Sequence, residues 1–312
     1  MGARTLVIGE SLIDIVHRPD GSTQEYVGGS PANVAVGLAR LGREVTFATR
    51  IGNDSRGTRI AAQLDEEGVR LTDGSVGKQP TSVATSTLDT TGAATYSFDL
   101  TWELDEVQVL EGLTHVHTGS VAATLEPGAS TVLNTIQKAR SSATISYDPN
   151  ARPSLMGDPH EVRAKIEQLI GLSDVVKASD EDVAWLYDGA PLSDILRLWG
   201  QLGPALLVIT RGHKGAVIGL SITGELTSIN AVAVEVVDTV GAGDSFMAGL
   251  VSGLLDAGLL GGVRARQRLR SASLAEVRPA VHRALACAAV TVSRAGANPP
   301  HLGDLAMSHG SE

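Results

Sequence analysis

The chain has 312 residues, of which 43% are hydrophobic and 19% charged, so it can bury a sizeable core and is too apolar for a disordered protein. No apolar run approaches the roughly 18 uninterrupted residues of a membrane-spanning helix, and the first residues lack the pattern of a signal peptide. A formal net charge of -10 disfavours binding to nucleic acid or anionic membranes. The single cysteine, Cys287, excludes an internal disulfide, so we expect a soluble cytoplasmic protein with this thiol in the core.

Short apolar stretches rich in Val, Ile and Thr alternate with helical patterns along most of the chain, which predicts a mostly parallel sheet covered by helices. The first helix is expected to begin at a capping Ser30, to carry Pro31 in its first turn and to end before Gly42. The expected core strands are residues 5–9, 45–50, 114–118, 144–148, 174–178 and 206–210.

Two segments break this alternation and predict a small sheet that projects from the main body. They are residues 13–27 and 81–100, and the second is expected to be a hairpin that turns at 89–93. A β-meander is expected at 216–237, and the arginine-rich stretch 264–270 is expected to be a solvated surface loop rather than a partner-binding patch. The predicted main domain comprises residues 1–12, 28–79 and 106–312, and the predicted lid comprises 13–27 and 80–105.

The most informative stretch is Asp-Thr-Val-Gly-Ala-Gly-Asp at residues 238–244, followed by an apolar helical pattern. Its two glycines let backbone N–H groups turn toward one point, where the positive end of the helix adds its field, so an anion site is predicted. Asp244 could simply cap this helix. Beside an anion site, however, its carboxylate suits phosphoryl transfer, in which it accepts a proton from the attacking hydroxyl.

Two other glycine-rich motifs that bind nucleotides are absent from the sequence. A dinucleotide-binding fingerprint would need a third glycine where Phe246 stands, and a Walker A loop would need Ser or Thr at Gln79 and glycine at Thr72. His115 and His117 share a strand face, but a pair without a third ligand is usually structural.

With these residues in view, the sequence resembles the ribokinase-like sugar kinases, also called the PfkB family. Residues 238–251 look like the C-terminal signature of that family, and residues 28–33 with Gly42 and Gly52 look like its N-terminal signature. The resemblance implies a ribokinase-like three-layer α/β sandwich with a small β-sheet lid, and ATP-dependent phosphorylation of a sugar hydroxyl. Residues 148–152, and more weakly Glu10, resemble the fructokinase and ketodeoxygluconate kinase branch.

The resemblance also implies which residues act. Asp244 would be the catalytic base, and the amides of Gly241, Ala242 and Gly243 would form the anion hole. Substrate contacts would come from Asp14, Gly28, Gly29, Asn33, Phe98, Trp102 and Arg152. Nucleotide contacts would come from Lys177, Thr210, Arg211, Gly212, Gly215 and Asn298. From the residues alone, Asp14 could equally be a strand-end carboxylate bonded locally, the two aromatic residues could be lid core, and Arg152 could be an ordinary surface residue.

The implied cofactors are ATP, Mg²⁺ and, in some members of the family, a monovalent cation such as K⁺. Ser179 and the shorter Asp182 stand where the family usually has the Asn and Glu of a magnesium-associated motif, so a water-bridged role is expected here. Carbonyl ligands leave no side-chain signature, so the presence of K⁺ stays open. Its candidate ligands are the carbonyls of Asp238, Val240, Arg294 and Gly296.

Two alternatives to a fructokinase-like sugar kinase stay open. One is an adenosine-type nucleoside kinase of the same fold, which would stack a base on the lid aromatics. The other is a sugar-binding sensor without catalysis, against which the intact Asp244 argues. The expected partners are a small-molecule sugar and ATP, and a homodimer through the lid is a candidate assembly.

Overall fold

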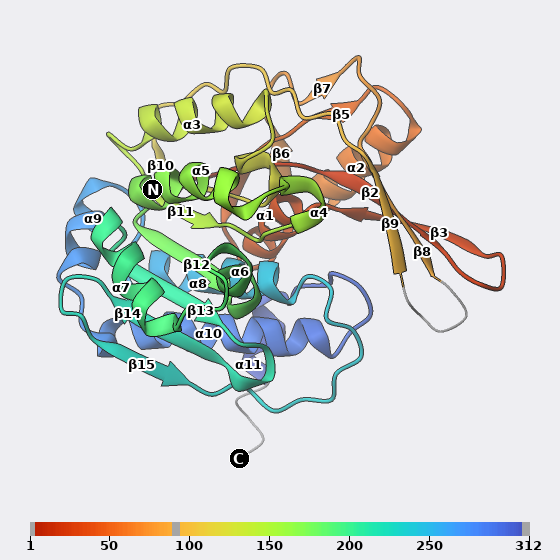
Figure 1. Cartoon of the computed structure of the whole chain (residues 1–312). Helices are drawn as coiled ribbons and strands as arrows, with labels where there is room; N and C mark the ends of the chain where they lie inside the picture. The colour runs from red at the N-terminus through yellow and green to blue at the C-terminus, as the bar shows by residue number, and fades with distance from the viewer. Residues whose placement is uncertain (1–3, 89–93, 308–312) are drawn as a thin grey trace.

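Nine strands form one sheet within residues 4–88 and 94–307, the part of the chain that the structure, a computed structural model, describes (Figure 1). Their order is β15-β14-β13-β12-β11-β10-β1-β4-β6. Only β14 runs antiparallel to its neighbours, so the predicted mostly parallel sheet is confirmed. The strands are β1 (Arg4–Ile8), β4 (Glu44–Ala48), β6 (Val69–Leu71), β10 (Leu113–Gly119), β11 (Thr144–Asp148), β12 (Val175–Ser179), β13 (Leu206–Thr210), β14 (Ala216–Leu220) and β15 (Leu226–Ile229).

Helices cover both faces of this sheet, which gives the expected three layers. Successive strand residues point to opposite faces, so Val7 joins one core cluster while Leu6 and Ile8 join the other. The first cluster contains residues of α1 (Ser30–Arg40), α2 (Ser55–Glu66), α8 (Ala242–Asp256) and α10 (Leu274–Val292). The second contains residues of α3 (Gly128–Ala139), α5 (Pro159–Leu172), α6 (Asp180–Leu186) and α7 (Leu192–Leu202).

A separate small sheet projects from this body, to the right in Figure 1. It has the order β3-β2-β8-β9 and consists of β2 (Leu12–His17), β3 (Thr23–Gly28), β8 (Val83–Leu88) and β9 (Ala94–Asp99). The second, smaller sheet expected from the sequence is therefore present. The turn expected at 89–93 lies outside the described residues, and the division of the chain into domains stays a prediction.

Short elements complete the described fold. They are β5 (Ile51–Gly52), β7 (Val76–Gly77), α4 (Pro153–Met156), α9 (Val263–Arg270), α11 (Leu302–Met307) and two 3₁₀ turns at Val121–Ala123 and Gly212–Lys214. Along the described ranges, none of the helices combines the length and the apolar character needed to cross a bilayer. Cys287 is buried, as expected.

The arginine-rich stretch 264–270 is not a loop, contrary to expectation. It forms α9, and the guanidinium of Arg266 donates to Asp174 Oδ1 at 2.7 Å and to the carbonyl of Arg140 at 2.8 Å. These acceptors lie far away in the sequence, so the local pattern of charges could not reveal them. The expected meander is also shorter, because strand structure ends at β15 and residues 230–237 continue without it.

Candidate active site

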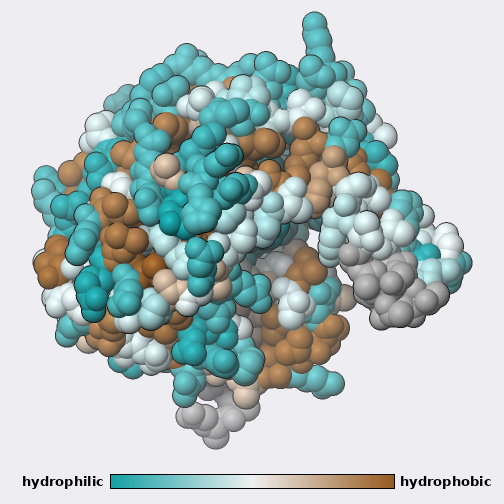
Figure 2. Space-filling model, in the orientation of Figure 1, coloured by the Kyte–Doolittle hydropathy of each residue, from teal (hydrophilic) through white to brown (hydrophobic). Residues whose placement is uncertain are grey.

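A cleft of about 1200 Å³ lies where the carboxyl ends of the parallel strands face the lid. Such edges are where open α/β sheets place their ligands. Glu10, Ser120, Asn150 and Thr210 line the cleft at the carboxyl ends of β1, β10, β11 and β13, and Phe98 lines it from the lid. Figure 2 shows the lid standing apart from the body across a hollow, with apolar side chains gathered near it. Residues of both sheets therefore line the cleft.

The start of α8 points its positive end into this cleft. Gly241 precedes the helix with a left-handed φ of 75°, and a side chain there would collide with Ala297, its Cβ being 2.7 Å from that of Ala297. Gly241, Ala242 and Gly243 all line the cleft. The first-turn N–H groups have no acceptor inside the helix, although the amide of Ala242 donates to the carbonyl of Thr239, just before the helix, at 3.3 Å. The positive end of α8 and the amides of Gly241 and Gly243 therefore suit an anion at this position.

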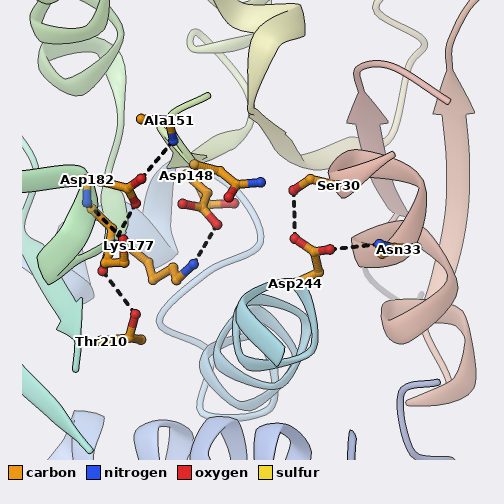
Figure 3. A network of polar contacts seen from close by, with 12 residues as sticks. Ser30, Asn33, Asp148, Ala151, Lys177, Asp182, Thr210 and Asp244 are labelled. Atoms are coloured by element: carbon orange, nitrogen blue, oxygen red, sulfur yellow. Dashed lines mark hydrogen bonds and ion pairs between the residues drawn. The ribbon is translucent and has the colours of Figure 1, made fainter. Parts of the chain in front are cut away.

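Asp244 lies in the first turn of α8 and both of its carboxylate oxygens are bound by α1 (Figure 3). Oδ1 accepts from the Ser30 hydroxyl at 2.6 Å, and Oδ2 accepts from Asn33 Nδ2 at 2.8 Å. Asp244 is only 8% exposed but belongs to the lining of the cleft. The carboxylate is therefore held in one orientation while remaining open to a ligand.

The structure corrects the role expected for Ser30. Helix α1 begins at Ser30 itself, its N-cap residue is Gly29, and no side chain caps it. The Ser30 hydroxyl donates to a carboxylate instead of serving a backbone amide, and hydrogen bonds to a charged acceptor are the stronger ones. The two residues are 214 positions apart, so sequence reasoning missed this contact.

Asp14 lies on β2 at the lid side of the cleft. Burial raises the pKa of Asp14 to about 6, and the positive charge of Arg152, which also lines the cleft, partly opposes this shift. Gly28 does not reach the cleft lining. It faces Asp14 instead, and a Cβ on Gly28 would lie 1.9 Å from Asp14 Oδ2, so the absent side chain leaves room for that carboxylate. Gly29 and Asn33 line the cleft as expected.

Glu10 is a second acidic residue of the cleft, and the sequence singled it out only as a weak sign of the branch. It is 7% exposed, and its Oε2 accepts from the backbone amide of Ala122 at 3.2 Å. Burial raises the pKa of Glu10 to about 7, against the opposing effects of its hydrogen bonds and of Arg152. A glutamate two residues after a buried strand was the available signal for this position.

The two aromatic residues predicted from the lid segment have different places. Phe98 lines the cleft. Trp102 does not line it and is 4% exposed, with its indole Nε1 donating to the carbonyl of Ala122 at 2.9 Å. The ring also packs against Gly128, where an added Cβ would lie 2.4 Å from it. Trp102 is therefore core of the body, and its expected stacking on the substrate is wrong.

Lys177 forms a buried ion pair with Asp148 at 2.7 Å (Figure 3). Burial alone would lower the pKa of Lys177, but the carboxylates of Asp148 and Asp182 outweigh it and raise that pKa. Burial raises the pKa of Asp148 to about 6 despite this neighbouring charge. Asp148 Oδ1 has no hydrogen-bond partner among the described residues, so one buried acceptor remains beside Lys177, outside the cleft lining.

Asp182 is satisfied by backbone groups. Its Oδ2 accepts from the amide of Ser179 and its Oδ1 from the amide of Ala151, both at 2.8 Å. The Ser179 hydroxyl accepts from the Asp182 amide in return, which completes a capping box at the start of α6. Asp182 thus caps α6 and also holds the loop after β11 through the amide of Ala151.

The predicted nucleotide residues divide into two groups. Thr210, Gly212 and Gly215 line the cleft, whereas Arg211 and Asn298 do not. The side chain of Asn298 instead accepts from Arg40. An apolar stretch that the sequence did not indicate lines the same region, namely residues 231–234 and 236 with Leu285, Ala288, Ala289 and Val292.

Asp238 joins the two loops that carry the candidate cation ligands. Its Oδ1 accepts from the amide of Val240 at 3.0 Å and its Oδ2 from the amide of Gly296 at 2.8 Å. Arg294 forms an ion pair with Asp304 at 3.0 Å. The carboxylate of Asp238 is therefore engaged in tying the loops together, which leaves backbone carbonyls as the candidate ligands there.

His115 and His117 are part of the core. His115 Nε2 and His117 Nδ1 share the hydroxyl of Ser146, at 2.9 and 3.0 Å. Burial lowers the pKa of each imidazole to about 3, so both are neutral at physiological pH. Among the described residues, no group of three or more His, Cys, Asp or Glu side chains is arranged to hold a metal ion.

Comparison with known proteins identifies the class. Residues 3–302 match the family model described as pfkB family carbohydrate kinase. The chain is 31% identical to a fructokinase of Klebsiella pneumoniae, covering 99% of this chain and 100% of that protein. It is 32% identical to a fructokinase of Escherichia coli, covering 95% of each. The chain therefore belongs to the pfkB family of carbohydrate kinases.

Solved structures agree with this assignment. Two structures of fructokinase from Vibrio cholerae O395 are similar to this chain with a TM-score of 0.80 and 26% identity, each covering 98% of this chain and 97% or 98% of its own. One is described in a form with fructose, ADP and calcium ion bound. The other, a double mutant, is described with fructose, ADP and potassium ion bound. The ribokinase-like fold expected from the sequence is thereby confirmed.

The Ser30 contact predicts a kinetic effect. Replacement of Ser30 by Ala should lower turnover roughly 10-fold, because losing a hydrogen bond to a charged group leaves the Asp244 carboxylate less firmly oriented. Steady-state kinetics would measure it. Ser245→Ala is the control, since Ser245 is also a buried serine, 1% exposed against 9% for Ser30, but its hydroxyl donates to the carbonyl of Cys287. Unchanged turnover in the Ser30 variant would contradict the assignment.

Proposed function

We propose that the protein transfers the terminal phosphoryl group of ATP to a sugar hydroxyl, and that fructose is the first substrate to test. The proposal rests mainly on one observation: Asp244 lies beside the first-turn amides of α8 in the same cleft as Asp14. The relatives described above are fructokinases, and the Vibrio structures hold fructose and ADP. Family and geometry thus favour a neutral sugar and an adenine nucleotide.

In this proposal Asp244 and the backbone amides before it have separate roles. Asp244 accepts the proton of the attacking hydroxyl, and the amides of Gly241, Ala242 and Gly243 hold the charge that develops on the transferred phosphate. A helix N-terminus makes a carboxylate a weaker base. A loose transition state tolerates this, because the hydroxyl then needs to be oriented early and deprotonated late.

The remaining cleft residues bind the two substrates. The carboxylate of Asp14 can accept hydrogen bonds from neighbouring sugar hydroxyls, with Gly29, Asn33, Phe98 and Arg152 completing the sugar end. Lys177 lies on the phosphate side, where a Cβ built on Gly243 would be 3.0 Å from its Nζ. Thr210, Gly212 and Gly215, together with the apolar stretch 231–234, provide the surface for the base and ribose.

ATP, Mg²⁺ and K⁺ are the proposed cofactors. Mg²⁺ neutralises phosphate charge when bound and usually keeps several of its waters. Both oxygens of Asp182 are bound to backbone amides, and the unpartnered Oδ1 of Asp148 is buried outside the cleft lining, so neither carboxylate is placed as a direct magnesium ligand and a water-bridged role is the one proposed. For K⁺, the candidate ligands are the carbonyls of the loops that Asp238 draws together. A homodimer through the lid and a cytoplasmic location stay predictions from the sequence.

A substrate panel separates this proposal from its rivals. Purified protein with ATP and Mg²⁺ should release ADP faster with fructose than with ribose, ketodeoxygluconate or adenosine, measured by a coupled assay. Preference for adenosine would favour a nucleoside kinase, in which Phe98 would stack on the base. Absence of ADP release with every acceptor tested would leave only the non-catalytic sensor.

Replacement of Asp244 by Asn tests the base. Turnover should fall by roughly 100- to 10,000-fold, because the amide cannot accept the proton, while the dissociation constant for ADP stays nearly the same. Rapid kinetics and calorimetry would measure the two quantities. Asp256→Asn, a change at the other end of α8, should retain turnover. Equal activity of the Asp244 variant and the wild type would remove Asp244 from the mechanism.

The raised pKa of Asp14 predicts pH-dependent sugar binding. Above its pKa of about 6 the carboxylate accepts hydrogen bonds, and as the pH falls through that value protonation removes acceptor sites. The dissociation constant for fructose should therefore rise about 10-fold from about pH 7 to about pH 5, measured by calorimetry without nucleotide.

Two variants assign this dependence to its residue. Asp14→Asn should bind fructose weakly at both pH values, with no slope between them. Glu10→Gln removes the other titrating carboxyl of the sugar end and should keep the slope. A pH dependence that persists in the Asp14 variant would show that another group carries it.

A further inference from the structure

Arg40 fixes a loop that packs against Gly241. It is the last residue of α1, and its Nη1 donates to Asn298 Oδ1 and to the carbonyl of Pro299, both at 2.6 Å. Its Nε and Nη2 bind the two carboxylate oxygens of Glu67, at 2.8 and 2.5 Å. The planar guanidinium therefore joins α1, the residue after α2 and the C-terminal loop in one rigid fork.

The loop that Arg40 holds, residues 296–299, is here called the bracing loop. Within it the amide of Asn298 donates to the carbonyl of Gly296 at 2.8 Å. The amide of Gly296 in turn donates to Asp238 Oδ2, and Asp238 Oδ1 accepts from the amide of Val240, the residue before Gly241. A continuous series of hydrogen bonds thus runs from Arg40 to the glycine turn.

Direct packing reinforces this connection. Ala297 lies so close to Gly241 that a Cβ built on the glycine would be 2.7 Å from the Ala297 Cβ. Asn298, expected from the sequence to contact nucleotide, is outside the cleft lining, and its side-chain oxygen is taken by Arg40. The bracing loop therefore acts on the anion site through its position.

We propose that Arg40 is a positioning residue for nucleotide phosphate, which it serves by holding the bracing loop against Gly241. The proposal rests on the kinase function proposed above. Its physical basis is that amide donors stabilise phosphate charge only when they are preorganised, so a small displacement of the turn weakens them all together. Arg40 also holds the pKa of Glu67 below its usual value, which keeps the pair charged and the guanidinium anchored.

Arg43 provides a matched control three residues further on. Its side chain is 17% exposed against 16% for Arg40, and each arginine pairs with a carboxylate at 2.5 Å. The partners of Arg43 are Asp256 and Ser252, toward the C-terminal end of α8 and away from the glycine turn. A purely structural role predicts similar consequences for both replacements.

The test compares Arg40→Met with Arg43→Met. Arg40→Met should raise the dissociation constant for ADP with Mg²⁺, and the KM for ATP, roughly 10-fold while leaving the KM for fructose unchanged. Arg43→Met should leave both nucleotide constants within about twofold, since it loses a comparable ion pair without touching the loop. Equal nucleotide defects in the two variants, or none in Arg40→Met, would overturn the proposal.

Asn298→Ala decides the matter if Arg40→Met fails to fold, because it keeps the Arg40–Glu67 pair. Asn298→Ala should weaken ADP binding, as Arg40→Met does. Where Arg40→Met folds, the double variant should bind ADP no more weakly than Arg40→Met alone. Additive losses would mean that Asn298 contacts nucleotide itself, and wild-type affinity in Asn298→Ala would also refute the role of Arg40. Absence of sugar-dependent turnover in the wild type would instead defeat the kinase proposal, while ADP binding would still report on Arg40.

Discussion

Asp244 accepts hydrogen bonds from two residues of α1 while lying in the first turn of α8, and this contact sets the geometry of the whole cleft. Ser30 and Asn33 have short side chains, so they reach the carboxylate only because the two helices pack closely. A Cβ built on Gly37 of α1 would lie 2.7 Å from the Ala248 Cβ of α8. Because α1 follows directly after the lid strand β3, the same contact also ties the lid to the anion site.

The charges of the cleft explain how an acidic protein can attract a polyanion. Lys177 is the buried cation of the phosphate side, but Asp148 compensates it at 2.7 Å. The attraction must then come largely from dipoles, that is, from the first-turn N–H groups and the positive end of α8. Such fixed dipoles act over a short range, so the net charge of -10 on the chain does not prevent local anion binding.

The sequence predicted features that depend on local pattern and missed those that depend on distant contacts. The parallel sheet, the small second sheet and the glycine turn before α8 follow from alternating apolar runs and from glycine spacing. The bond from Ser30 to Asp244 spans 214 positions, and no local signal distinguishes it from a helix cap. Trp102 follows β9 closely in sequence, so only the path of the chain could show that it packs into the body.

The prediction of a loop at 264–270 was wrong because this segment also depends on contacts that are distant in the sequence. A dense run of arginines lowers apolar content and suggests solvation, yet Ala265 and Leu269 are buried and Arg266 finds three acceptors within the body. Tertiary contacts outweighed local composition there. The sequence did not reveal that residues 231–234 line the cleft, because a valine-rich run cannot be distinguished from a strand until its neighbours are known.

Asp182 illustrates how one shorter side chain changes what a position does. Its oxygens bind the amides of Ser179 and Ala151, so α6 and the loop after β11 are fixed to each other. That loop carries Arg152, whose Nη1 donates to the side-chain and backbone oxygens of Asn150. With the loop held on both sides, the guanidinium charge stays where it lowers the pKa of both Glu10 and Asp14, against the opposing effect of burial. Asp182 thus contributes to the electrostatics of the cleft by fixing the loop that carries Arg152.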